Sequence, residues 1–129
     1  MKHVIGALLF YSAFSYGSDV CRDIKTSEQV YACSNIKKNE ADEYLNKQYS
    51  GLLSKINSEY VNDDALRREL ITNLKISQRD WIKFRDSNCK LYSFQIESDS
   101  PAHQTTINEC VAKMSANRGK ELSAFSNDL

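Results

Sequence analysis

The apolar residues of this 129-residue chain are spaced as they are in helices. Three long stretches place them three or four positions apart, which puts them on one side of an α-helix. No stretch alternates apolar and polar residues in the way that a half-buried strand does. Glycine and proline, which interrupt helices, number only four and one. The sequence therefore predicts an all-α fold.

The first predicted helix begins where Thr26 can cap the backbone and Gln29, three residues on, can return the bond as in a capping box. Its apolar stripe consists of Val30, Cys33, Ala41, Leu45, Tyr49, Leu52 and Ile56. The apolar spacing lapses from Ser58 to Asp63, and Asn62, Asp63 and Asp64 then offer capping side chains for a second helix.

The second predicted helix extends to about Ile96, and a polar break over Glu97 to Ser100 follows it. Its stripe consists of Leu66, Leu70, Leu74, Ser77, Trp81, Phe84, Asn88 and Leu91. Ser100 as cap and Pro101 as first residue open a third helix. The stripe of that helix consists of Ile107, Val111, Met114, Arg118, Leu122 and Phe125. Short connections make neighbouring helices antiparallel, so we expect an elongated three-helix bundle that runs up, down and up.

Residues 1–17 resemble an export signal. A basic start precedes an apolar run from Val4 to Phe14, which is shorter than the roughly 20 apolar residues of a membrane span. Small residues then lead to Gly17, after which we expect cleavage. The mature protein would be one domain over residues 18–129, periplasmic or secreted. Because no small residue directly precedes Cys21, we expect no lipid anchor in the membrane.

All four cysteines lie in the expected mature domain, and an even number in a small exported chain predicts two disulfides. In an antiparallel hairpin, residues equally far from the turn lie at the same height. Cys89 and Cys110 satisfy this condition around the second turn, which favours their pairing and leaves Cys21 with Cys33. Cys33 and Cys89 satisfy it around the first turn, so the other pairing stays open.

Charge and motifs exclude several classes of function. Without Lys2, 16 basic residues stand against 17 acidic ones, which gives no electrostatic reason to expect nucleic acid as a partner. His103 is the only histidine of the mature part, and no two cysteines are closer than twelve residues, so neither a metal site nor a catalytic triad is expected. We expect no cofactor and no enzymatic activity.

The segment from Gln78 to Cys89 concentrates polar and aromatic side chains on one strip of the second helix. Arg85 should come within a helical turn of Asp42 and Asn46 on the first helix. Trp81 should lie level with Arg118, which interrupts the apolar stripe of the third helix. We expect an internal polar network that fixes helix register, with a ligand site as the alternative. Its members are Asp42, Asn46, Gln78, Trp81, Arg85 and Arg118.

At these residues the chain resembles the family named after the lysozyme inhibitor LprI. The matching features are Cys21 and Cys33 around a helix start, Ala41-Asp42-Glu43-Tyr44-Leu45-Asn46-Lys47-Gln48-Tyr49, Gln78 through Cys89, and Cys110 with Arg118 and the Glu121-Leu122 pair. The resemblance covers nearly all of the mature chain. It implies a helical, exported, disulfide-stapled domain whose named activity is inhibition of lysozyme.

We therefore expect a protein-binding domain that inhibits a lysozyme (muramidase), or another cell-wall hydrolase, by occluding its glycan cleft. Acidic side chains at the ends of the helical hairpins would steer it toward a basic enzyme. The candidates for partner binding are Asn62, Asp63, Asp64, Glu97, Asp99 and His103. The alternative is an immunity or envelope-stress accessory protein that binds a different cell-wall-active partner.

Overall fold

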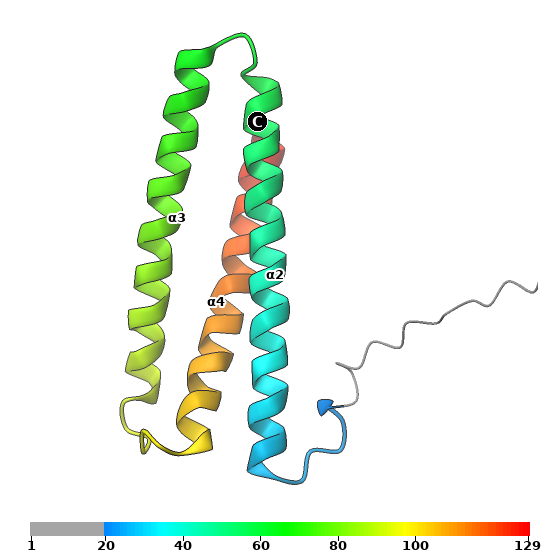
Figure 1. Cartoon of the computed structure of the whole chain (residues 1–129), viewed down its shortest axis with the longest axis vertical. Helices are drawn as coiled ribbons and strands as arrows, with labels where there is room; N and C mark the ends of the chain where they lie inside the picture. Colours follow the sequence, from blue (N-terminus) through cyan, green and yellow to red (C-terminus); the bar gives the residue numbers. More distant parts are fainter. Residues whose placement is uncertain (1–19) are drawn as a thin grey trace, which may run out of the picture.

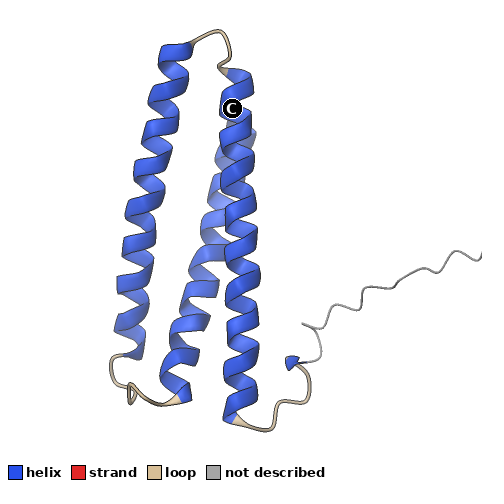
Figure 2. Ribbon diagram, viewed as in Figure 1, coloured by secondary structure: helices blue, strands red, loops and turns tan. Residues whose placement is uncertain are grey.

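The computed structural model describes residues 20–129, which form three long helices. Helix α2 spans Ser27–Glu59, α3 spans Asp64–Ser93 and α4 spans Pro101–Asp128. The helices run up, down and up in an elongated bundle (Figure 1), and the regular structure of the described residues is helical throughout (Figure 2). The predicted fold is confirmed. The expected export signal lies outside the described residues.

The three helices begin where the capping signals predicted. The Thr26 hydroxyl accepts from the Gln29 backbone N–H at 3.3 Å, and the Gln29 side chain accepts from the Thr26 backbone N–H at 3.1 Å, which completes the capping box. Asp63 accepts from the N–H of Leu66, and Ser100 caps the helix that Pro101 opens. Local side-chain to backbone bonds of this kind satisfy donors that a helix start leaves unpaired.

Helix α3 ends at Ser93, three residues before the predicted end at Ile96. The backbone N–H of Phe94 bonds to the carbonyl of Leu91, and that of Ile96 bonds to the carbonyl of Ser93, so the chain tightens into turns. The ring of His103 then hydrogen-bonds to the Ile96 carbonyl at 3.1 Å. These bonds use backbone groups that a longer helix would need for its own ladder.

Both expected disulfides of the sequential pairing are present. Cys21 is bonded to Cys33, which folds the N-terminal segment against the start of α2, and Cys89 is bonded to Cys110, which joins α3 to α4. The alternative pairing, with Cys33 bonded to Cys89, is thereby excluded. Two disulfides are consistent with a protein that works outside the cytoplasm.

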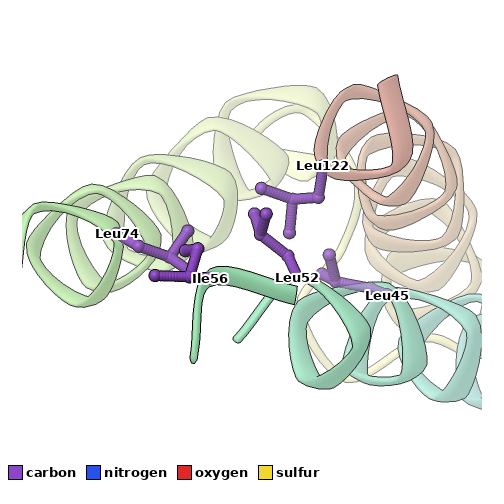
Figure 3. Close-up of a cluster of buried hydrophobic side chains, with 5 residues drawn as sticks. All are labelled: Leu45, Leu52, Ile56, Leu74 and Leu122. Atoms are coloured by element: carbon purple, nitrogen blue, oxygen red, sulfur yellow. The ribbon is translucent and has the colours of Figure 1, made fainter. Parts of the chain in front are cut away.

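The apolar core occupies the half of the bundle near the α2–α3 turn. Side chains from all three helices meet there (Figure 3), and the buried members are Leu45, Leu52, Ile56, Leu74 and Leu122. The other half of the bundle buries mainly small and polar side chains, among them Ser34, Ser93, Thr105, Asn108 and Ser115. Because that half has little apolar surface to bury, the two disulfides lie where the hydrophobic effect contributes least.

Helices α2 and α4 pack closely side by side, whereas α3 approaches α4 less closely and α2 least of all (Figure 1). The predicted stripe of α3 is consequently wrong at four positions, since Leu66, Ser77, Phe84 and Leu91 are exposed. A helix that stands away from its neighbour can bury only a narrow strip of its surface.

Among the described residues, no helix combines the length and the hydropathy that a membrane span requires.

Candidate functional site

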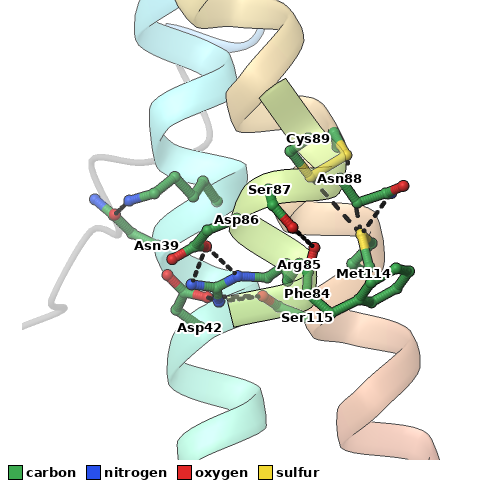
Figure 4. A network of polar contacts seen from close by, with 12 residues as sticks. Asn39, Asp42, Phe84, Arg85, Asp86, Ser87, Asn88, Cys89, Met114 and Ser115 are labelled. Carbon is green, nitrogen blue, oxygen red and sulfur yellow. Dashed lines mark hydrogen bonds and ion pairs between the residues drawn. A yellow bond between two sulfur atoms is a disulfide. The ribbon is translucent and has the colours of Figure 1, made fainter. Parts of the chain in front are cut away.

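A polar cluster joins all three helices near the middle of the bundle (Figure 4). Arg85 of α3 donates from Nη1 to Oδ1 of Asp42 on α2 and to Oγ of Ser115 on α4, both at 3.1 Å. Ser115 donates to the same Asp42 oxygen at 2.8 Å. The guanidinium also pairs with Asp86 at 2.9 Å. One arginine thus fixes the height of three helices relative to one another.

A second arginine enters the bundle from α4. Arg118 donates from Nε to Oε1 of Gln78 at 3.1 Å, from Nη2 to Ser77 at 2.9 Å and from Nη1 to Glu121 at 3.0 Å. Arg118 lies in the apolar stripe of its helix, and these hydrogen bonds give its guanidinium N–H groups the acceptors they need there.

Trp81 lies between the two arginines. The Cζ atom of Arg85 is 5.4 Å from the centroid of the Trp81 ring and that of Arg118 is 5.9 Å from it, distances within the range of cation–π attraction. Five of the six residues expected in the network are thus brought together. Asn46 is the exception: it forms no side-chain hydrogen bond within the described residues and instead lines a groove between α2 and α3.

Sulfur atoms gather next to this cluster, on its side toward the α3–α4 connection. The thioether of Met114 lies 3.7 Å from Cys89 Sγ and 4.0 Å from Cys110 Sγ, and the side-chain amide of Asn88 donates to it at 3.4 Å (Figure 4). The flexible methionine packs over the disulfide and fills the space between α3 and α4. In the part of the chain that the structure covers, no three His, Cys, Asp or Glu side chains are placed to hold a metal ion.

The six residues expected to bind a partner do not form one surface. Asn62, Asp63 and Asp64 lie at the α2–α3 turn, whereas Glu97, Asp99 and His103 lie at the α3–α4 connection. These two places are at opposite ends of the bundle (Figure 1), separated by the length of α3, about 45 Å for 30 helical residues. A single partner domain that enters by one end therefore cannot use both sets.

The acidic side chains at the α2–α3 turn are occupied within the protein. The carboxylate of Asp63 caps α3, and that of Asp64 forms ion pairs with Arg67 and Arg68 one turn further on. These contacts reduce the negative potential that the turn presents to a partner.

The last turn of α3 and the α3–α4 connection carry a group of exposed apolar side chains that the sequence did not indicate as a site. Leu91, Tyr92 and Phe94 are 73%, 67% and 83% exposed, and they precede Glu97 and Asp99 directly in the chain. We call these five residues the loop-end surface. The sequence signal for it was present as three large apolar residues within four positions beside a polar break, but helical periodicity assigned Leu91 to the core.

One carboxyl group at this end of the bundle has a perturbed acidity. A hydrogen bond from its own backbone N–H and a further one from Thr26 lower the pKa of Glu28 below its usual value of 4.5. Glu28 lies in the first turn of α2, where unpaired N–H groups and the helix dipole favour a carboxylate. The shift is therefore explained by the helix start and indicates no catalytic group.

Comparison with known proteins identifies relatives over most of the chain. The family described as "Lysozyme inhibitor LprI" matches residues 21–122. An uncharacterized protein of Rhizobium meliloti (strain 1021) is 28% identical over 105 residues, which cover 79% of this chain and 75% of the relative. The fold is similar to the crystal structure of a DUF1311 family protein from Pseudomonas putida, with a TM-score of 0.72 and 23% identity. That alignment covers 81% of this chain and 97% of the other.

Proposed function

The chain belongs to the lysozyme inhibitor LprI family, and from this membership we propose that it binds a muramidase outside the cytoplasm and blocks its glycan cleft. The match over residues 21–122 is the observation that carries the proposal, because it includes α2, α3, most of α4 and both disulfides. Inhibition of this kind needs a surface of fitting shape and charge and no chemistry by the inhibitor.

The loop-end surface is the part of the protein that we assign to the partner. Exposed aromatic side chains supply most of the binding energy in many protein interfaces, and Tyr92 and Phe94 are the most prominent aromatic pair here. Between Leu91 and Ala112 the chain has three acidic residues and no lysine or arginine. Lysozymes are generally basic, so this charge pattern favours the encounter.

The loop-end surface is held rigidly enough to enter a cleft without reordering. The disulfide between Cys89 and Cys110 ties together the two helices that flank the loop-end surface, and His103 holds the connection through the Ile96 carbonyl. A preorganised loop loses little conformational entropy on binding, which raises affinity. We infer that the network around Trp81 serves as scaffold and keeps the helices in register.

Export follows from the same proposal. Residues 1–17 would act as a cleaved signal, residues 18–129 would be the mature domain, and the protein would act in the periplasm or after secretion. The disulfides and the family support a place outside the cytoplasm.

The test is lysis of cell-wall suspensions by c-type, g-type and i-type lysozymes, with the purified oxidised protein at a several-fold molar excess. We expect dose-dependent loss of lysis by one type. The variant Phe94→Ser should lose this inhibition, and Val61→Ser, which changes an exposed apolar residue at the opposite end, should keep it.

Absence of inhibition for every lysozyme type would overturn the proposal and favour a different cell-wall-active partner, as an immunity or envelope-stress protein would have. If Val61→Ser abolished inhibition and Phe94→Ser did not, the surface would be the α2–α3 turn instead.

A further inference from the structure

A groove of about 660 Å³ lies between α2 and α3, away from the loop-end surface. It exists because α3 stands off from α2, while α2 and α4 pack closely. Its walls include Asn46 and Tyr49 of α2 and Lys75, Ile76, Gln78 and Arg79 of α3. Neither the inhibitor proposal nor the scaffold role of the polar network accounts for these residues as a group.

Gln78 presents an unused donor to this groove. Gln78 is only 9% exposed as a residue, and its Oε1 atom accepts a hydrogen bond from Arg118 at 3.1 Å. No hydrogen bond within the described residues involves its Nε2 atom. Since no fully buried side-chain nitrogen or oxygen in that range lacks a partner, Nε2 keeps some exposure, and we infer that it is reached through the groove that Gln78 lines. A buried amide whose N–H groups have no acceptor in the protein is a position where a ligand oxygen gains a strong bond.

Positive charge lies beside this donor. Lys75 and Arg79 are four residues apart on α3, so both side chains project from one face of the helix. Neither takes part in any ion pair among the described residues, and no acidic side chain lines the groove. Like charges at this spacing repel one another, and a bound anion would relieve the repulsion.

Apolar surface completes the groove. Ile76 is substantially exposed on the same wall, and Tyr49 lines the groove from α2. A bare phosphate or sulfate would use the cations and leave this surface uncovered. A ligand that has an anionic group, a carbonyl oxygen and an apolar group would use all three features.

We propose that the α2–α3 groove binds a short peptide-like ligand with a free carboxylate. The carboxylate lies between Lys75 and Arg79, a neighbouring carbonyl oxygen accepts from Nε2 of Gln78, and an apolar side chain of the ligand packs against Ile76 and Tyr49. Cell-wall peptides and ordinary peptide C-termini share this chemistry. The inference does not depend on the inhibitor proposal, because the two surfaces have no residue in common.

The test is a titration of the ¹⁵N-labelled mature oxidised protein, followed by NMR, with acetyl-Ala-Ala-Leu as the free acid and as the carboxamide. We expect saturable shifts of the Gln78 side-chain amide signals with the acid and at least about tenfold weaker binding of the carboxamide, because the ion pairs are lost. Lys75→Gln and Arg79→Gln should each weaken binding of the acid by a similar factor. Lys120→Gln, an exposed lysine of α4 with no part in the groove, is the matched control and should leave it unchanged.

A parallel titration with N-acetylmuramyl dipeptide separates the two sources. Tighter binding than that of acetyl-Ala-Ala-Leu would assign the groove to cell-wall fragments, and equal binding would assign it to peptide carboxylates in general. The proposal is overturned if no probe gives saturable shifts at millimolar concentration, if acid and carboxamide bind equally, or if Lys120→Gln weakens binding as much as Lys75→Gln. Lysis assays on the same variants keep this result separate, since neither groove substitution should alter inhibition.

Discussion

Gly119 on α4 lies directly against the ring of Tyr44 on α2, so that a Cβ atom at position 119 would come within 2.7 Å of Tyr44 Cδ1. This contact lets α2 and α4 pack as closely as they do. Gly119→Ala should therefore destabilise the protein although alanine is the better helix former. Overpacking costs about 1–3 kcal/mol and the gain in helix propensity is about 1 kcal/mol, so we expect a net loss of about 1 kcal/mol in urea denaturation.

The control for this prediction is the same change in a Tyr44→Ala background. With the ring removed, only the propensity term remains, and Gly119→Ala should stabilise the variant by about 1 kcal/mol. A loss of similar size in both backgrounds would show that the ring is not the cause.

The ion pair that joins three helices should matter more than the one beside it. Asp42 and Asp86 both pair with Arg85, but the Asp42 side chain is 31% exposed and the Asp86 side chain 53%. Asp42→Asn should lower the free energy of unfolding by about 1–2 kcal/mol, since Arg85 and Ser115 both lose a charged acceptor. Asp86→Asn, the matched change on the same guanidinium, should stay within about 0.5 kcal/mol. Equal effects in urea denaturation would contradict a register role for the cluster.

The two disulfides should contribute unequally to the stability of the bundle. Replacing Cys89 and Cys110 by alanine should lower it by about 3 kcal/mol, because that bond closes a loop between two ordered helices. Replacing Cys21 and Cys33 frees mainly the segment before α2, so the midpoint of urea unfolding should move less. Equal shifts of the midpoint would mean that this segment unfolds together with the bundle.

The local features of the fold could be predicted from the sequence because each depends on a few adjacent residues. The cap at Thr26 and the start at Pro101 are of this kind, and the disulfide between Cys89 and Cys110 follows from the symmetry of a hairpin. The close approach of α2 and α4 could not be predicted from the sequence. It is made by small residues such as Ser115 and Gly119, and such residues occur equally on exposed helix faces. The exposed face of α3 is a consequence of that approach, so it could not be predicted from the sequence either.

The candidate site was predictable to a smaller extent. Heights along antiparallel helices place Arg85 near Asp42, and these residues do form a bond. Periodicity cannot tell which apolar residues lose their cover when one helix stands away, so Tyr92 and Phe94 were not singled out. The free amide of Gln78 is visible only when the hydrogen bond from Arg118 to its other end is known.

The start of α2 provides a prediction about pH. The folded protein lowers the pKa of Glu28, so this group contributes stability above its unfolded pKa, and the contribution is lost as the pH falls through the folded pKa. Three hydrogen bonds lower this pKa, from the Glu28 backbone N–H, from Thr26 and, as the weakest of the three, from Ser27, and Thr26→Ala removes one of them and should raise the pKa toward the usual value. It should also cost about 1 kcal/mol through the lost cap. NMR titration of the Glu28 side chain measures the first effect; an unchanged pKa would assign the shift to the backbone N–H and Ser27.

Association with a muramidase should separate the roles of charge and of aromatic contact at the loop-end surface. Glu97 and Asp99 are exposed at its edge, where charges act over distance and mainly set the rate of encounter. Phe94 is the most exposed of the large apolar residues described and can be buried by a partner, so its loss should speed dissociation. Surface plasmon resonance with the inhibited lysozyme should therefore show slower association for Glu97→Gln with Asp99→Asn. This effect should fade as salt is raised, since exposed charges more than about 10 Å apart are largely screened at 0.1 M. Phe94→Ser should leave the association rate nearly unchanged and raise the dissociation rate at least about tenfold, as expected for an aromatic anchor.

Glu43→Gln, which changes an exposed acid on the middle of α2, is the matched control and should alter neither rate. If the charge variant instead raised the dissociation rate independently of salt, the acids would lie inside the interface, and the partner would have to cover the whole connection from Ser93 to Pro101.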